Sequence, residues 1–240
     1  MSDSARYFEY IDKYCERTAE GLWAEPLNVI SNIAFFIVAI LLFRFYRQHF
    51  KGKFIKYWDI SLLIALMFFI TGGSTLWHVY SLRWALYTDA IPILIFINVF
   101  LLSCFVRILG LSVSAVILLF LLYQLFNYGI QLNFSMDTLN GSIFYLPVWI
   151  FITGILFFAC RNRDGLCHYY LISVGLFSAA LVLRTFDISQ CDNFPTGTHF
   201  LWHILIATML FFLTKSLMLS QLIPTVSVDM TDKPGVTHKS

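Results

Sequence analysis

Charged side chains are scarce in this sequence. Lysine and arginine number 16 and aspartate and glutamate number 14, so that 12% of the 240 residues are charged, whereas soluble domains carry about 25%. Hydrophobic residues make up 59% of the chain. This balance excludes an ordinary water-soluble domain and is typical of a protein that crosses a membrane several times. The formal net charge of +2 gives no indication of nucleic-acid binding.

A signal peptide, internal repeats and low-complexity segments are also missing. The first 25 residues contain no uninterrupted apolar stretch, so we expect no cleavable leader. They carry six acidic side chains, namely Asp3, Glu9, Asp12, Glu16, Glu20 and Glu25. We expect residues 1–224 to form a single domain and the polar residues 225–240 to form a short disordered tail.

Seven apolar runs are long enough to cross a bilayer as helices. Each crossing takes roughly 20 residues, because a helix satisfies its own backbone hydrogen bonds inside the membrane. The runs cover about 27–43, 58–77, 86–106, 111–129, 143–160, 168–184 and 199–220. The sequence therefore predicts an all-α fold, a seven-helix transmembrane bundle.

Lysine and arginine are divided unevenly between the two sides of this bundle. One side carries eleven of them, and the side that holds the N-terminus carries five, namely Arg6, Lys13, Arg17, Arg83 and Arg184. Cytoplasmic loops are enriched in these residues. We therefore predict an integral multi-pass protein with its N-terminus outside or in a lumen and its C-terminus in the cytoplasm. The membrane is either a bacterial inner membrane or an endomembrane.

Four ionisable residues then lie at similar depth near the outer face. The second run ends at His78, Asp89 lies near the outer end of the third, and the seventh begins with His199 and His203. Ionisable groups inside a membrane are costly and usually functional. His199 and His203 are four residues apart and share a helix face, and His78 would complete a three-histidine set of the kind that binds catalytic zinc. The alternative is a pair of histidines hydrogen-bonded at a helix interface.

Ser74 and Asp89 are candidate catalytic residues beside this set. Ser74 precedes His78 by one helical turn and could donate a hydrogen bond to an oxyanion, or it could bond a carbonyl of its own helix. Asp89 could orient a ligand histidine or act as a general base towards water. The alternative for Asp89 is a salt bridge with Arg83.

Gly72 and Gly73 immediately precede Ser74. Small residues let helix backbones approach closely inside a membrane. We therefore expect both glycines to lie at a close helix contact.

Two patterns resemble a known family. Tyr14-Cys15-Glu16 and the stretch Ala24-Glu25-Pro26-Leu27-Asn28-Val29-Ile30-Ser31-Asn32 are similar to the opening signature of alkaline ceramidases. Ser74-x-x-x-His78, Asp89 and His199-x-x-x-His203 resemble the hydrolase superfamily that joins those enzymes to the adiponectin-receptor-like proteins. The resemblance extends from about residue 10 to about residue 220.

The resemblance implies a zinc-dependent amidase. By it, His78, His199 and His203 hold zinc, while Ser74 and Asp89 assist the attacking water. The substrate is then ceramide or a related N-acyl lipid, cleaved to a fatty acid and a sphingoid base. A receptor-like member of the same superfamily is the alternative. No haem is expected, because two of the histidines share one helix face instead of facing each other from separate helices.

The resemblance also implies a calcium site in the N-terminal segment. Asp12, Glu16 and Glu25 are its candidate ligands, although Lys13 stands where the family has an aspartate. The alternative for Glu25 and the polar residues that follow it is a polar cap with interhelical hydrogen bonds at the start of the first helix.

A disulfide is implied by the same resemblance, because related ceramidases carry a bond between the regions of Cys15 and Cys191. Both cysteines fall on the predicted outer side, where disulfides persist. Cys160 and Cys167 fall on the predicted reducing side, and Cys104 falls inside the third helix.

Overall fold

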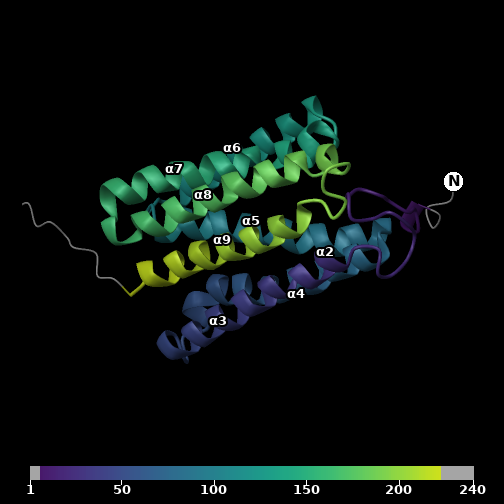
Figure 1. Cartoon of the computed structure of the whole chain (residues 1–240). Helices are drawn as coiled ribbons and strands as arrows, with labels where there is room; N and C mark the ends of the chain where they lie inside the picture. The colour runs from purple at the N-terminus through teal and green to yellow at the C-terminus, as the bar shows by residue number, and fades with distance from the viewer. Residues whose placement is uncertain (1–5, 223–240) are drawn as a thin grey trace, which may run out of the picture.

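The computed structural model describes residues 6–222, and the predicted tail 225–240 lies outside them. Helices supply the regular secondary structure of the described chain, which contains no named strand. Seven of the helical spans are long and apolar enough to cross a membrane. The predicted seven-helix, all-α bundle is therefore confirmed (Figure 1).

The helices follow the apolar runs to within a few residues, and the first run is divided into two pieces. Short 3₁₀ segments, η1 (Ile55–Tyr57), η2 (Thr138–Tyr145) and η3 (Ile188–Gln190), lie in the connections. The long helices are α2 (Pro26–Ser31) with α3 (Ile33–His49), α4 (Trp58–Tyr80), α5 (Arg83–Arg107), α6 (Val113–Asn133), α7 (Leu146–Asn162), α8 (Asp164–Phe186) and α9 (His199–Ser220).

Helix α9 occupies the centre of the bundle. It packs against α2, α3, α4, α5 and α8, and Figure 1 shows it running through the middle of the molecule. Half of the residues in the most apolar parts of α4 and α9 are buried, whereas only 17% are buried in the corresponding part of α6. Any group on the buried face of α9 is therefore surrounded by several helices.

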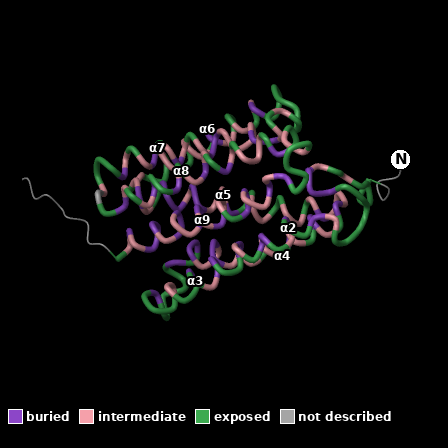
Figure 2. The backbone as a smooth tube through the Cα atoms, in the orientation of Figure 1, coloured by how far each residue is buried: buried purple, intermediate pink, exposed green. Residues whose placement is uncertain are grey.

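The outer surface of the bundle is strongly apolar. Figure 2 shows exposed residues along the outward faces of the helices. On α6 alone, nine large hydrophobic side chains are exposed, among them Ile117, Leu118, Leu121, Leu122 and Leu125. Monomeric water-soluble proteins rarely present a contiguous apolar face of this kind, whereas lipid covers it in a multi-pass membrane protein.

Helices α4 and α5 are in close backbone contact at Gly73. A Cβ atom built on Gly73 would overlap the backbone carbonyl oxygen of Thr88 in α5, whereas one built on Gly72 has no atom within 4 Å. The close contact predicted for Gly73 is confirmed and the one predicted for Gly72 is wrong. Successive residues point about 100° apart around a helix, so only one of two adjacent glycines can face the neighbouring helix.

We expect Gly73→Ala to lower the free energy of unfolding by about 1–3 kcal/mol, because the new methyl group must push two backbones apart. Gly72→Ala is the matched control, since it adds the same atom one residue away in open space. The control should be neutral or slightly stabilising, because alanine has the higher helix propensity. Thermal unfolding of both variants in detergent checks this; equal losses in the two would contradict the assigned contact.

Candidate metal centre

Three buried histidines meet at one end of the bundle. His78 lies in the last turn of α4, and His199 and His203 lie in the first two turns of α9. All three are at most 3% exposed. One ligand atom from each lies within 4.8 Å of the others, and within residues 6–222 no other group of three metal-ligating side chains meets this criterion. The predicted set is thus brought together by two helices that are more than a hundred residues apart in sequence.

The start of α9 is set by Asp187, a fully buried carboxylate in the α8–α9 connection. Its Oδ1 accepts hydrogen bonds from the backbone N–H groups of Thr198 and His199, the latter at 3.0 Å. These N–H groups have no partner within the helix, and a negative charge is favourable at this end of a helix dipole. Gly197 makes the contact possible, because its φ is +62° and a Cβ on it would overlap Asp187 Oδ1. Asp187 therefore positions His199.

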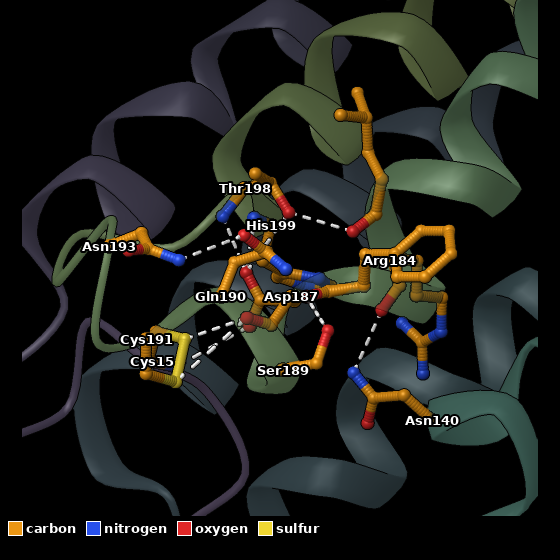
Figure 3. Close-up of a disulfide and its surroundings, with 12 residues drawn as sticks. Cys15, Asn140, Arg184, Asp187, Ser189, Gln190, Cys191, Asn193, Thr198 and His199 are labelled. Carbon is orange, nitrogen blue, oxygen red and sulfur yellow. Dashed lines mark hydrogen bonds between the residues drawn. A yellow bond between two sulfur atoms is a disulfide. The ribbon is translucent and has the colours of Figure 1, made fainter.

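A disulfide joins Cys15 to Cys191 beside Asp187 (Figure 3). It ties the N-terminal segment to the α8–α9 connection, and the backbone N–H of Cys15 also donates to Asp187 Oδ2 at 3.4 Å. The predicted Cys15–Cys191 pairing is confirmed. The N-terminal segment is thus held over the histidine end of the bundle.

A second disulfide joins Cys160 to Cys167, and it differs from the expectation that these residues lie on a reducing side, where such bonds are rare. The α7–α8 connection is so short that it brings their Cα atoms to 4.5 Å across only seven residues of sequence. Cys104 is free and buried inside α5, as predicted.

Hydrogen bonds donated by their Nδ1–H groups orient two of the histidines. His78 Nδ1 contacts Glu25 Oε2, and a carboxylate can only accept, so Nδ1 carries the proton. His203 Nδ1 lies 2.7 Å from Ser31 Oγ, whose own proton is donated to the carbonyl oxygen of Asn28 at 3.0 Å. Ser31 therefore accepts from His203 Nδ1, and in both rings the Nε2 atom is left with a lone pair.

These two Nε2 atoms face each other at 3.2 Å. Facing lone pairs repel unless a cation or an extra proton lies between them. Two nitrogens bound at about 2.0–2.1 Å to a tetrahedral metal are about 3.3 Å apart, so the observed spacing fits a shared metal ion. His199 adds a third imidazole, whose Nδ1 is buried without a hydrogen-bond partner. The donor set and this unpartnered nitrogen both fit a metal.

Tyr14 closes the site from the N-terminal segment. Its ring stacks on that of His199, with centroids 4.0 Å apart, and its hydroxyl accepts a hydrogen bond from Trp77 Nε1 at 3.3 Å. Burial raises the pKa of Tyr14 to about 12. Tyr14 therefore covers the ligand set as a neutral aromatic wall.

Glu25, which the sequence marked as a candidate calcium ligand or as part of a polar cap, contacts a candidate metal ligand. It is fully buried and accepts hydrogen bonds from Arg17 Nε, Asn28 Nδ2 and His78 Nδ1. Arg17 also donates through Nη2 to the backbone oxygen of His78 at 2.7 Å. Burial acts to raise the pKa of Glu25, but the hydrogen bonds from His78, Asn28 and Arg17 outweigh it and hold the pKa below its usual value. Glu25 is therefore an anion held between a guanidinium and a candidate metal ligand.

Of the three roles considered for Asp89, two require a specific partner, either a ligand histidine or Arg83, and Asp89 has neither. Arg83 pairs instead with Glu9 at the surface, and the carboxylate bonded to His78 is Glu25, not Asp89. Asp89 lies in the second turn of α5, near Ser74 of α4. Its Oδ1 is shielded from solvent and has no hydrogen-bond partner. Asp89 is therefore free to act on a bound molecule.

The three candidate calcium ligands do not converge on one point. Glu16 accepts from the backbone N–H groups of Leu27 and Asn28, at 2.6 and 2.9 Å, and so caps α2. Glu25 is bonded by Arg17, whose guanidinium takes the place against this carboxylate that a cation would need. Asp12 is exposed. The interpretation of this stretch as a polar cap with interhelical hydrogen bonds describes the structure better, and the polar residues at three-residue spacing after Glu25 were its signal in the sequence.

Comparison with protein-family models gives no match for this chain, and comparison with curated proteins gives none. The functional interpretation therefore depends on the geometry of the site and on the sequence resemblance.

Proposed function

We propose that this protein is a membrane-embedded, zinc-dependent amidase that hydrolyses ceramide or a related N-acyl lipid to a fatty acid and a free amine. The observation that carries the proposal is the buried histidine triad with two Nε2 lone pairs directed at one point. Three imidazole ligands, with no thiolate or carboxylate among them, form one of the ligand sets of catalytic zinc sites. A bound zinc ion supplies Lewis-acid polarisation of a carbonyl and activation of water.

Asp89 is the proposed general base and acid. It is the acidic side chain beside the triad whose Oδ1 has no protein partner, whereas the carboxylate of Glu25 is occupied by three donors. Asp89 would accept the proton of the attacking water and return it to the leaving amine. Ser74 of α4, which lies next to Asp89 of α5, would donate a hydrogen bond from its hydroxyl group to the developing oxyanion.

Glu25 and Ser31 are proposed to orient the ligands. Each accepts from the Nδ1–H of one histidine, which keeps Nε2 unprotonated and fixes the ring plane. Such outer partners determine both the tautomer and the basicity of metal-ligating histidines.

The position of the site near the ends of two spans supports an N-acyl lipid as the substrate. His78 lies two residues before the end of the span Ile55–Tyr80, and His199 begins the last span. The amide of an N-acyl lipid lies near the membrane interface, below its headgroup. With the N-terminus outside or in a lumen, as the division of lysine and arginine indicates, the site would face the outer leaflet.

The test combines metal analysis with an amidase assay on the purified full-length protein. We expect about one zinc ion per chain, together with release of fatty acid from a long-chain N-acyl sphingoid base. His203→Ala should lose both. A His203→Ala protein that keeps stoichiometric zinc and full amidase activity would show that the proposal is wrong. Zinc lost in the variant, with no N-acyl lipid cleaved by the natural chain, would favour the receptor-like alternative.

A further inference from the structure

Two cationic side chains beside the triad have no carboxylate partner. A Cβ atom built on Gly141 would lie 3.3 Å from Arg184 Nη2 and 3.9 Å from Lys13 Nζ, so both cationic groups border the same small space. The other cations near the buried parts of the bundle are neutralised: Arg17 pairs with Glu25 and Arg107 with Asp59. No acid of the described chain reaches salt-bridge distance of Lys13 or Arg184.

The lack of an anionic partner for Lys13 and Arg184 is energetically unfavourable because of their partly buried environment. Both side chains are half-buried, and Arg184 Nε is shielded from solvent without an acceptor. Burial, followed by the charge of Arg184, lowers the pKa of Lys13, while the exposed Asp137 opposes this only from a distance. An unpaired buried donor and two like charges at one place both favour the entry of an anion.

Aromatic rings hold Arg184 next to the triad. Its guanidinium lies 5.1 Å from the ring centre of Trp202 and 5.6 Å from that of Tyr145. Trp202 directly precedes His203, and the ring of Tyr14, adjacent to Lys13 in sequence, stacks on His199. Cation–π contacts of this kind hold a guanidinium in one orientation without neutralising its charge. Lys13 and Arg184 therefore lie beside the histidines, on the same side of the space next to Gly141.

The η2 segment forms the other side of this space. Leu139, Asn140 and Gly141 have φ of 52°, 50° and 77°, a left-handed path that is uncommon for the first two of these residues. Asn140 Nδ2 donates to the backbone oxygen of Arg184 at 2.9 Å and fixes the loop on the end of α8 (Figure 3). Because Gly141 has no side chain, the loop can wrap over the two cations while room remains beside them.

We propose that Lys13 and Arg184 bind an anionic oxygen group of a lipid, a carboxylate or a phosphate, next to the histidine triad. This inference rests on the proposed function, since the anion would be either the fatty-acid carboxylate that hydrolysis releases or a phosphate in the headgroup of the N-acyl substrate. The planar guanidinium can donate to two oxygens at once, and the ammonium adds a point charge.

Binding of three eight-carbon probes to the full-length protein in neutral-lipid nanodiscs tests the inference. Octanoate, octyl phosphate and octanol share one alkyl chain, and at pH 8 the first two are anionic. We expect at least one of the two anions to bind about ten-fold or more tightly than octanol, as charge-assisted hydrogen bonds require. The more tightly bound anion identifies the source, carboxylate or phosphate.

Substitution then locates the site. Lys13→Gln combined with Arg184→Gln should abolish the preference for the anion, and Lys13→Gln alone should reduce it. The single variant keeps the test decisive if the double variant does not fold, because Lys13 lies outside the helices. Arg83→Gln removes the same charge at the same end of the bundle, from a residue that already has an acidic partner, and should keep the preference.

A fourth variant separates this inference from the proposed function. His203→Ala removes a metal ligand, and the preference for the anion should survive in it. Loss of the preference there would mean that the anion binds the metal site, and equal binding of octanol and both anions to the natural chain would equally overturn the inference. Neither result would test the amidase proposal, which is decided by zinc content and amide hydrolysis.

Discussion

Asp89→Asn should slow amide hydrolysis by about 100- to 10,000-fold, the usual contribution of a general acid–base group, while zinc stays bound. The substitution keeps the size of the side chain but removes its capacity to accept and return a proton. No candidate metal ligand relies on Asp89, because Glu25 and Ser31 orient His78 and His203. Rates of fatty-acid release and zinc content, measured on the same preparation, check both halves of the prediction.

Asp59→Asn is the matched control for this substitution. Asp59 is also a buried carboxylate, but it lies at the opposite end of α4, where it accepts from Ser103 and pairs with Arg107. This control should lose stability and keep the rate per folded molecule. A full hydrolysis rate in Asp89→Asn would remove the residue from the mechanism, and loss of zinc would show that its role is structural.

Arg17→Met should destabilise the protein by about 3–5 kcal/mol, the typical cost of leaving one charge of a buried pair uncompensated. The side chains of Arg17 and Glu25 are 1% and 0% exposed, so water cannot replace the lost guanidinium. The same substitution should weaken zinc binding, because Arg17 bonds both Glu25 and the backbone oxygen of His78. Denaturant unfolding and competition with a zinc chelator measure the two effects.

Two further variants separate charge from geometry. Arg17→Met combined with Glu25→Gln removes both charges and should recover part of the stability, while zinc affinity stays about 10- to 100-fold reduced, as expected for loss of an outer carboxylate. Arg83→Gln is the surface control, since its pair with Glu9 is exposed to water, which screens the attraction between the two charges. If Arg17→Met were as mild as this control, the Arg17–Glu25–His78 network would not stabilise the site.

The roles of the acidic residues could be predicted only in part. Asp89 and Glu25 were both recognised as candidate site residues, but their partners were not. The polar residues Glu25, Asn28 and Ser31 at the start of the first helix did indicate interhelical hydrogen bonds, and two of those bonds prove to reach the histidines. Which histidine each would meet depends on how α2 lies against α4 and α9, which no local pattern expresses.

The roles of the cationic residues could likewise be predicted only in part. Charge counting identified Lys13, Arg17 and Arg184 as members of one side of the bundle, because side depends only on the number of crossings. It could not tell that Arg17 is neutralised by Glu25 while Lys13 and Arg184 converge beside Gly141 without an acid. Whether an acidic residue neutralises a given cation depends on contacts between segments that are far apart in the sequence.

The sequence by itself determined the seven spans and the shared face of His199 and His203, because bilayer thickness and helical periodicity act on each segment separately. Gly73 shows where that reasoning ends, since the sequence marked two adjacent glycines and only the packing of α4 on α5 distinguished them. The tertiary structure alone decided that Glu25 orients His78 across 53 residues and that Ser31 orients His203 across 172. The physical reason is that a buried polar group must find a partner wherever the fold places one, and that place is a property of the whole bundle.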